Sequence, residues 1–342
     1  MTMKKRSISL IVLALAMSLV MYNCKKGDPL EPDSELIDKI NDIKVDTITL
    51  VKPAAVTTTP ATVTASAKAA EVSSGLANIA SSGTVPATVS TAANDVKAAI
   101  SPAEVSTLAA VSPATIAAVS AGGALPADLK SIMDKAAANP ALKAYLPTFT
   151  LPTVNGVAVP GRQGASIPET IAQSEGLQVS DECLQKAEDA YTAVKATLDA
   201  SRADELARVE AAYQAAVTPL AAEQAACTAG VPAKYDPLRT AAQAAYDKAN
   251  SDLDAAQSIL GPELYALLKA LNSIALLGNL GTINTLQAAD LNACSAKTAA
   301  ATTAAQAARA ANTAAAEAAY QTALKAAIEA KQELAQSCHN QG

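Results

Sequence analysis

The sequence predicts an all-α protein in which short N-terminal helices precede a long antiparallel helical hairpin or bundle stapled by disulfides. Half of its residues are hydrophobic, yet only 3% are aromatic, so the apolar content is largely alanine with leucine, valine and isoleucine. Alanine is the strongest helix former and adds little bulk, which favours close helix–helix packing over a wide core. A proline–alanine–polar–aliphatic motif recurs in the N-terminal half, and two cysteine pairs of equal spacing lie in the C-terminal half.

The first element, residues 1–23, is predicted to be a signal peptide. "KKR" at 4–6 precedes the apolar run "LIVLALAMSLVM" at 10–21. Crossing a hydrocarbon core of about 30 Å takes about 20 residues, so this run is too short to span a membrane. A basic start followed by a short apolar run is typical of a secretory signal.

Cys24 directly follows this region, and "VMYNC" with "CKKGD" resembles the signal of bacterial lipoproteins, in the looser form used by some Gram-negative groups. Met21, Tyr22 and Asn23 depart from the usual motif, which has leucine and two small residues there. The resemblance implies cleavage before Cys24, a diacylglyceryl group on its sulfur and an acylated amino group, which palmitate would label. The alternative is an ordinary signal peptide or short anchor in which Cys24 is incidental.

The same resemblance implies an address in the cell envelope. Lys25, in place of an aspartate, implies transfer to the outer membrane, with the periplasmic or surface face left open. Two or three acyl chains anchor firmly because each buried CH₂ contributes about 0.8 kcal/mol. We therefore expect a lipid-anchored envelope protein that acts as a structural spacer or protein-interaction module. Its expected partners are the membrane, through the lipid on Cys24, and an envelope protein that the sequence does not identify.

Residues 24–53 are predicted to be a tether with a short structured element. "DSELIDKINDI" at 33–43 predicts a helix because its aliphatic residues share one face: Leu36, Ile37, Ile40 and Ile43. "KVDTITLVKP" at 44–53 alternates apolar and polar residues, which predicts a short strand. Within it, Asp46-Thr47-Ile48 resembles an O-glycosylation sequon of some Gram-negative groups.

Residues 54–145 are predicted to be a region of short helices. The motifs "PATV", "PATV", "PAEV", "PATI" and "PADL" begin at residues 60, 86, 102, 113 and 126. Proline suits the first helical position, and a preceding serine or threonine can cap, as expected for Thr59, Ser101 and Ser112. Ser101 and Glu104 fit a capping box. The predicted helices are 61–80, 87–99, 102–110, 113–120 and 126–138. The alternative is a disordered, mucin-like stalk.

Residues 146–179 are predicted to be an extended connector. Four prolines and three glycines lie between 146 and 168, a density that excludes helix. The chain is therefore expected to pass here from its N-terminal part to its C-terminal part.

Residues 180–342 are predicted to be the long-helix hairpin domain, with a coiled-coil-like seam of aliphatic and tyrosine residues. Cys183 lies 44 residues before Cys227, and Cys294 lies 44 residues before Cys338. In one helix that spacing corresponds to about 66 Å, whereas a disulfide needs Cα atoms within about 7 Å. Pairing inside either segment is therefore excluded.

Facing residues of an antiparallel pair have numbers with a constant sum. The numbers 183 and 338 add up to 521, as do 227 and 294. We therefore predict the disulfides Cys183–Cys338 and Cys227–Cys294, and an even number of cysteines in an exported chain supports them. Parallel pairing, 183 with 294 and 227 with 338, is the second choice, and four free thiols are the third.

Between the staples, Asp236-Pro237 is predicted to open a helix that Gly261-Pro262 ends. "ELYALLKALNSIALLGNLGTI" at 263–283 is the most apolar stretch after the signal region. It is interpreted either as the buried tip of a bundle or as an exposed surface. The exposed surface implies the alternative function, a membrane-active or partner-docking protein that uses residues 263–283. The candidate surface residues are Leu264, Leu267, Leu268, Leu271, Ile274, Leu276 and Leu277.

The net charge and the absence of catalytic motifs argue against several classes of function. The net charge is −6; without the three basic residues before Cys24, 23 basic face 32 acidic residues, a net −9. This balance argues against a nucleic-acid partner. The single histidine, His339, leaves no histidine base for a nucleophile, and no metal-ligand or phosphate-loop motif occurs. We therefore expect no enzyme activity, metal or cofactor. Glu205 and Arg208 are expected to form a helical ion pair on an outer face.

Overall fold

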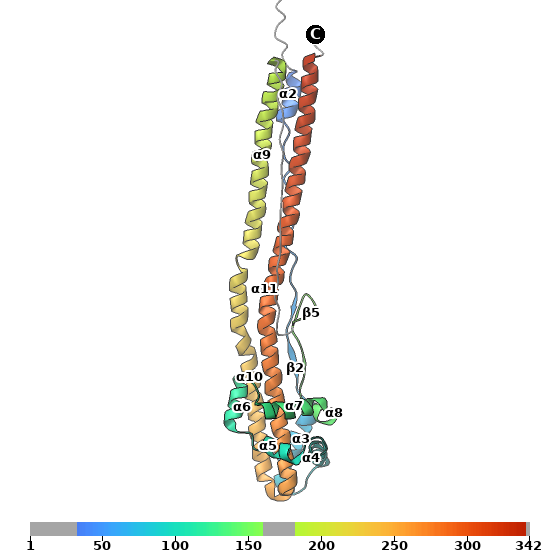
Figure 1. Ribbon diagram of the computed structural model, residues 1–342, viewed down its shortest axis with the longest axis vertical. Coiled ribbons are helices and arrows are strands. Elements are labelled where there is room, and N and C mark those ends of the chain that lie inside the picture. Colours follow the sequence, from blue (N-terminus) through green and yellow to red (C-terminus); the bar gives the residue numbers. More distant parts are fainter. Residues whose placement is uncertain (1–32, 160–181, 340–342) are drawn as a thin grey trace, which may run out of the picture. The chain divides into compact units, whose positions relative to one another are not determined.

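The computed structural model describes residues 33–159 and 182–339, and its fold confirms the all-α prediction (Figure 1). The chain divides into two compact units. Unit 1 comprises residues 1–53, 167–215 and 305–342, and unit 2 comprises 54–166 and 216–304. The signal peptide, Cys24 and residues 160–179 of the predicted connector lie outside the described residues. The long helices are α9 (Glu182–Val217), α10 (Leu220–Ala255) and α11 (Gln257–His339).

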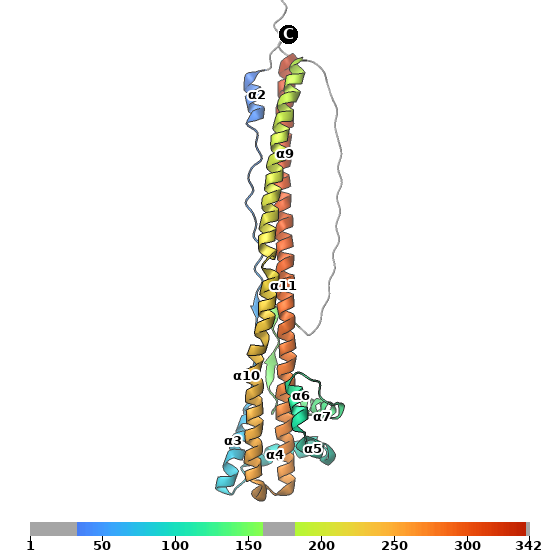
Figure 2. The same cartoon turned by 90° about the vertical axis from the view of Figure 1, so that its left-hand side faces the viewer.

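In unit 1, α9 runs antiparallel to the C-terminal part of α11, and the two helices lie side by side (Figures 1 and 2). The predicted helix at 33–43 is confirmed as α2 (Ser34–Asn41), which begins after Asp33, whose side chain accepts from the Glu35 backbone N–H at 2.9 Å. Ile40 of α2 is fully buried against α9 and α11. The core of unit 1 is built mostly from small and aliphatic residues: Ala187, Val194, Leu198, Ala323, Ala327, Ala330 and Leu334.

The predicted strand at 44–53 is wrong, since the chain there pairs with no other strand. Instead, the Val51 backbone N–H donates to Oδ1 of Asn312 at 2.7 Å, and the Val51 carbonyl accepts from Nδ2 at 3.0 Å. Asn312 lies on α11 and is 3% exposed. The buried Asn312 side-chain amide needs hydrogen-bond partners, and the Val51 backbone provides them. The Val51 backbone therefore bonds to a side chain and not to a neighbouring strand.

Ion pairs across the hairpin of unit 1 keep one register. Glu188 pairs with Lys331, Arg202 with Glu317 at 2.7 Å, and Glu210 with Arg309 at 2.7 Å. In each pair the residue numbers add up to 519, close to the 521 of the cysteines. Exposed pairs of this kind contribute little stability each, so their role here is to favour one alignment of two alanine-rich helices.

Unit 2 contains the short helices, and the alternative of a disordered stalk is wrong. They are α3 (Ala67–Ser82), α4 (Ala87–Ala99), α5 (Pro102–Ala109), α6 (Pro113–Ser120), α7 (Ala127–Ala138) and α8 (Pro140–Lys143). Four of the five predicted helices match within one residue at each end. Ser112 caps α6 as predicted, accepting from the Thr115 N–H at 3.1 Å.

The first short helix begins six residues later than predicted, and Thr59 is not its cap. Thr58–Thr59 forms β1 and Thr62–Thr64 forms β2, and Ser66 caps α3 instead, accepting from the Ala69 N–H at 3.0 Å. The β-branched Thr62-Val63-Thr64 run favours a strand. Its partner, β3 (Thr148–Thr150), lies far along the chain, with Val63 opposite Phe149.

The described part of the predicted connector is free of helix, but it is more than a connector. β4 (Thr153–Val154) pairs with both β1 and β5 (Val157–Ala158), which gives a three-stranded sheet in the order β1-β4-β5. Asn155 and Gly156 have φ of 50° and 77°, as a tight hairpin turn requires. The chain thus folds back onto residues 58–64.

Some prolines and glycines of the long helices break the helix, whereas others lie inside it. α9 ends at Val217 and α10 begins at Leu220, just after Pro219. Gly261, with φ of 70°, breaks the helical path before Pro262 as predicted. The helix start predicted at Asp236-Pro237 is wrong, because α10 runs through both Pro232 and Pro237. Buried Tyr235 and the disulfide at Cys227 hold this stretch against α11, which offsets the lost backbone donors.

The predicted capping box at α5 is present and carries a long-range ion pair. Ser101 Oγ accepts from the Glu104 N–H, and Glu104 Oε2 accepts from the Ser101 N–H at 3.0 Å. Lys135 of α7 binds the same carboxylate. The Lys135 ammonium, followed by the Ser101 hydrogen bonds, lowers the pKa of Glu104 from 4.5 to about 2.

Glu104→Gln is expected to reduce the acid dependence of unit 2 stability. A carboxyl with a folded-state pKa below its unfolded value stabilises the fold above the unfolded pKa and loses that effect as the pH falls through the folded pKa. The stabilisation by Glu104 is therefore present above pH 4.5 and disappears between pH 4.5 and about 2. Thermal unfolding across this range measures it. Asp128→Asn, an exposed acid of α7 outside any ion pair of the described structure, is the control.

Candidate functional site

The seven aliphatic residues predicted as a candidate surface belong to the interior of unit 2. Leu267, Leu268, Leu271, Ile274, Leu276 and Leu277 are between 0% and 8% exposed, and Leu264 is partly buried. The short helices cover them: Ile274 and Leu277 share a core with residues of α3, α4, α5 and α7, whereas Leu276 packs with Ile116 and Val119 of α6. These side chains are therefore buried, as the first of the two interpretations predicted, and do not form an exposed surface in unit 2.

Hydropathy alone would suggest a membrane helix at this place. By length and composition, α11 is the one described helix that could cross a membrane, or one of two if the bent pair α5–α6 is counted as a span. Of the apolar 18-residue stretch of α11 that is long enough to span a membrane, 56% is buried inside the protein. Core helices give the same signal, and the burial of Ile274 and its neighbours explains it here.

The two cysteine pairs have the predicted antiparallel connectivity. Cys183 is bonded to Cys338 with Cα atoms 5.9 Å apart, in unit 1. Cys227 is bonded to Cys294 with Cα atoms 5.8 Å apart, in unit 2. The parallel pairing and the four free thiols are wrong, because the hairpin register places each cysteine opposite its predicted partner.

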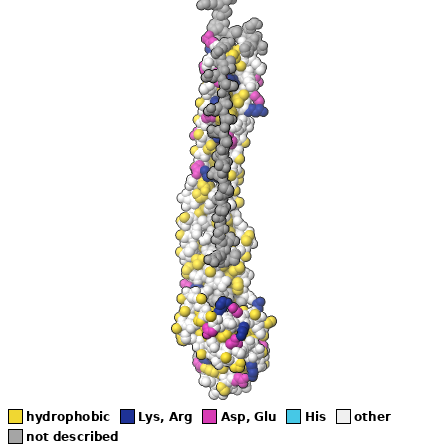
Figure 3. Space-filling model, viewed as in Figure 1, with side chains coloured by type: hydrophobic (Ala, Val, Ile, Leu, Met, Phe, Trp, Pro, Cys, Tyr) yellow, Lys and Arg dark blue, Asp and Glu magenta, His cyan; other side chains and the backbone are white. Residues whose placement is uncertain are grey.

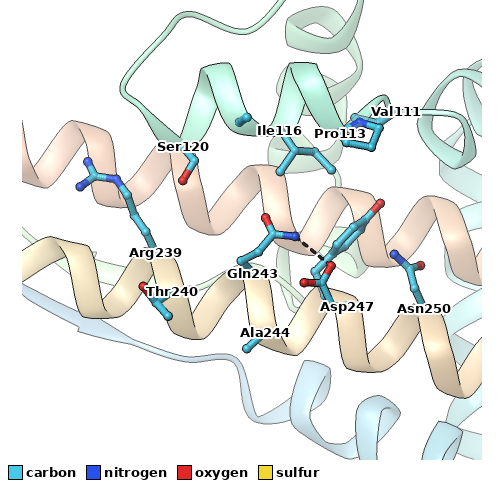
Figure 4. A pocket seen from close by; sticks show the side chains of 12 residues that line it. Val111, Pro113, Ile116, Ser120, Arg239, Thr240, Gln243, Ala244, Asp247 and Asn250 are labelled. Carbon is cyan, nitrogen blue, oxygen red and sulfur yellow. Dashed lines mark hydrogen bonds between the residues drawn. The ribbon is translucent and has the colours of Figure 1, made fainter.

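A groove of about 820 Å³ lies between α6 and α10 in unit 2. Figure 4 shows Ile116 and Ser120 of α6 on one side of the groove. The same side includes Pro113, the first residue of α6, and Val111, which precedes the helix. The other side is one face of α10, formed by Arg239, Thr240, Gln243, Ala244, Asp247 and Asn250, with Tyr246 also in the lining. The volume lies in the range of ligand-binding clefts.

Hydrogen bonds fix the Arg239 end of this groove. The Arg239 guanidinium donates to Asp236 at 3.1 Å, to Asn284 at 2.9 Å and to Gln287. Asn284 in turn donates to the Val119 carbonyl at the end of α6, at 2.8 Å. This chain links α10, α11 and α6, so both walls of the groove are held in place. The Arg239 Nε is buried and has no hydrogen-bond partner among the described residues.

The other end of the groove is rich in acceptors. Gln243 donates to Asp247 at 2.9 Å, which aligns the carboxylate along α10 (Figure 4). Asp247 is exposed and forms no ion pair within the described residues. The adjacent Asn250 accepts from Asn272 of α11 at 3.1 Å, which anchors α10 here. This end therefore presents one carboxylate whose charge is not balanced by a cation of the protein.

Elsewhere, the tyrosines share a repeated arrangement with a cation and a carboxylate. In six cases a Lys or Arg lies over the ring, at 4.4 to 5.3 Å from its centre, and the same cation pairs with an Asp or Glu. The six are Tyr145, Tyr191, Tyr213, Tyr235, Tyr265 and Tyr320. Cation–π contacts of this geometry favour a fixed packing where side chains are otherwise small.

These arrangements also shift the titration of their members. The Lys68 ammonium holds the pKa of Asp95 below its usual value, and burial together with a hydrogen bond to Asp95 raises the pKa of Tyr145. Burial and Asp290 raise the pKa of Tyr235 in the same way. Tyr145 and Tyr235 therefore stay neutral donors, and Asp95 stays charged.

Tyr246 differs from the other tyrosines that the structure describes. No cation of the described residues lies over its ring, whereas a Lys or Arg lies over the ring of each of the other six. It is half-buried in the groove and packs against the cluster of Ile116, Val119 and Leu280. No sequence pattern predicts this groove, because α6 and α10 come together only in the folded protein.

Other predicted residues fall outside this groove. Glu205 and Arg208 form the predicted helical pair at 2.6 Å, but Glu205 is 8% exposed, so it does not lie on an outer face. Thr47 is exposed in unit 1. Over residues 33–159 and 182–339, no three His, Cys, Asp or Glu side chains come together as a metal site would require.

Charge on the visible face of the short-helix region is mixed. In the space-filling view, Lys and Arg side chains alternate with Asp and Glu over these helices (Figure 3). No single sign of charge dominates that face.

The comparisons with known proteins give no relative. No protein-family model matches the chain, and no match was found among the curated proteins or the solved structures.

Proposed function

We propose that this protein is a lipid-anchored component of a bacterial cell envelope, held in the outer membrane through Cys24. In this role it acts as a structural spacer or protein-interaction module and not as an enzyme. The signal-like start, the cysteine at its end and the polar "KKGDP" that follows support the anchor.

The observation that carries the proposal is the pair of disulfides that join the long helices. These helices are rich in alanine and need the covalent bonds to stay together. Disulfides persist in oxidising compartments such as the periplasm and the cell surface. The alanine-rich seam buries little area per residue, so covalent bonds are an effective way to hold it. Both features fit a protein that works outside the cytoplasm.

The interaction role is supported by unit 2. Its short helices build a core around the apolar segment of α11 and leave a groove between α6 and α10. The sequence offers no histidine base beside a nucleophile, which favours binding over catalysis.

Cys24→Ala is expected to abolish lipid labelling. Cells grown with radioactive or clickable palmitate should label the wild-type chain, and the variant should lose the label and leave the membrane fraction on cell fractionation, because the acyl chains supply the attachment. Asp28→Asn, four residues further along the same tether, is the matched control and should keep the label. Label that persists in Cys24→Ala would refute the proposed anchor.

A further inference from the structure

The groove between α6 and α10 carries the elements of an incomplete cation site. Six tyrosines each have a cation over the ring that also pairs with a carboxylate, whereas no cation of the described residues lies over the ring of Tyr246. The next residue, Asp247, lines the same groove and carries a charge that no cation of the described structure balances. A carboxylate and an aromatic face in one cleft attract a positive group.

The basic side chains of α10 on either side of this site have other partners. Lys248, one residue further along, is paired with Asp252 at 2.7 Å. Arg239 is directed to Asp236, Asn284 and Gln287 at the opposite end of the groove. The cations near this end are thus engaged elsewhere, and the groove keeps a net preference for a positive group from outside.

The volume of the groove and its α6 side indicate what kind of ligand fits. A volume of about 820 Å³ is much larger than one ammonium or guanidinium group needs. The α6 side is apolar, with Val111, Pro113 and Ile116 facing α10 (Figure 4). A fitting ligand therefore combines a cation with an adjacent aliphatic group.

We propose that this groove binds a segment of a partner protein in which an arginine or lysine lies beside an aliphatic residue. The cation sits between the Tyr246 ring and the Asp247 carboxylate. The aliphatic side chain packs on Val111 and Ile116, while Gln243, already bonded to Asp247, holds the carboxylate in place. The inference rests on the proposed function, since it names the binding site of the interaction module.

The experiment uses the full chain, purified in detergent, and two fluorescent nonapeptides. One carries arginine between two leucines in an otherwise Ser/Ala sequence, and the other has glutamine in place of arginine. The arginine peptide should bind saturably in fluorescence anisotropy, with an affinity at least tenfold above that of the glutamine peptide. Its affinity should fall as salt is raised, because the contact is ionic and partly exposed.

Three variants separate the site from the rest of the surface. Asp247→Asn keeps an acceptor for Gln243 and should weaken binding of the arginine peptide about tenfold. Tyr246→Leu keeps the apolar packing and should weaken binding about fivefold. Asp128→Asn, an exposed acid of α7, should leave the affinity unchanged.

Several results would overturn the inference. They are equal binding of the two peptides, unchanged binding by Asp247→Asn, no saturable binding at all, or competition by free butylamine as effective as the arginine peptide. Self-association that Asp247→Asn abolishes would assign the groove to a second copy of this chain instead. The palmitate experiment is independent: label without peptide binding rejects the groove alone, whereas peptide binding without label rejects the anchor.

Discussion

Replacing Cys227 and Cys294 together with alanine is expected to lower the free energy of unfolding by about 4 kcal/mol. The bond closes a loop across 67 positions of the chain, and in the chain-entropy model closing such a loop restricts the unfolded state by that amount. Urea unfolding followed by circular dichroism measures the loss.

Reductant provides the control for this prediction. The wild-type chain in reductant should approach the stability of the variant in which all four cysteines are alanine, and that variant should not respond to reductant. Hydrogen exchange locates the effect: loss of the Cys227–Cys294 bond should reduce protection first in unit 2, and loss of the Cys183–Cys338 bond first in unit 1. Stability that is unchanged by reductant would contradict the role given to the staples.

Ile274→Asp is expected to destabilise unit 2 by about 4 kcal/mol or more. Ile274 is fully buried in the core that α3, α4, α5, α7 and α8 form with α10 and α11. A carboxylate placed there loses its hydration and has no partner, which is among the most costly single changes in a protein. The midpoint of urea unfolding and the retained helicity measure the effect.

Ile328→Asp is the matched control on the same helix. Ile328 is 39% exposed, so the same substitution should change stability by about 0.5 kcal/mol or less. A stable Ile274→Asp protein would show that the segment is not core, and would return it to the role of an exposed surface. The comparison therefore tests the correction made by the tertiary structure.

The sequence by itself determined four of the five short helices and the antiparallel register of the cysteines. Proline and serine specify the starts of α5 and α6 through local backbone chemistry, which needs no distant partner. Helix geometry excluded pairing within a segment and made the antiparallel disulfides the first choice, because both pairs have the same sum of residue numbers; the structure then decided against the parallel pairing. Each of these conclusions depends on residues close together in sequence or on the constant rise of a helix.

Only the tertiary structure decided which surfaces are covered and which segments pair. The pattern at 44–53 fits a strand, yet its backbone pairs with the side chain of Asn312, while Thr62–Thr64 became a strand because Thr148–Thr150 lies beside it. Hydrophobicity of 263–283 could not reveal that the short helices bury it. The groove of Tyr246 and Asp247 likewise exists only where α6 meets α10, since the free energy of such contacts depends on neighbours that no local pattern encodes.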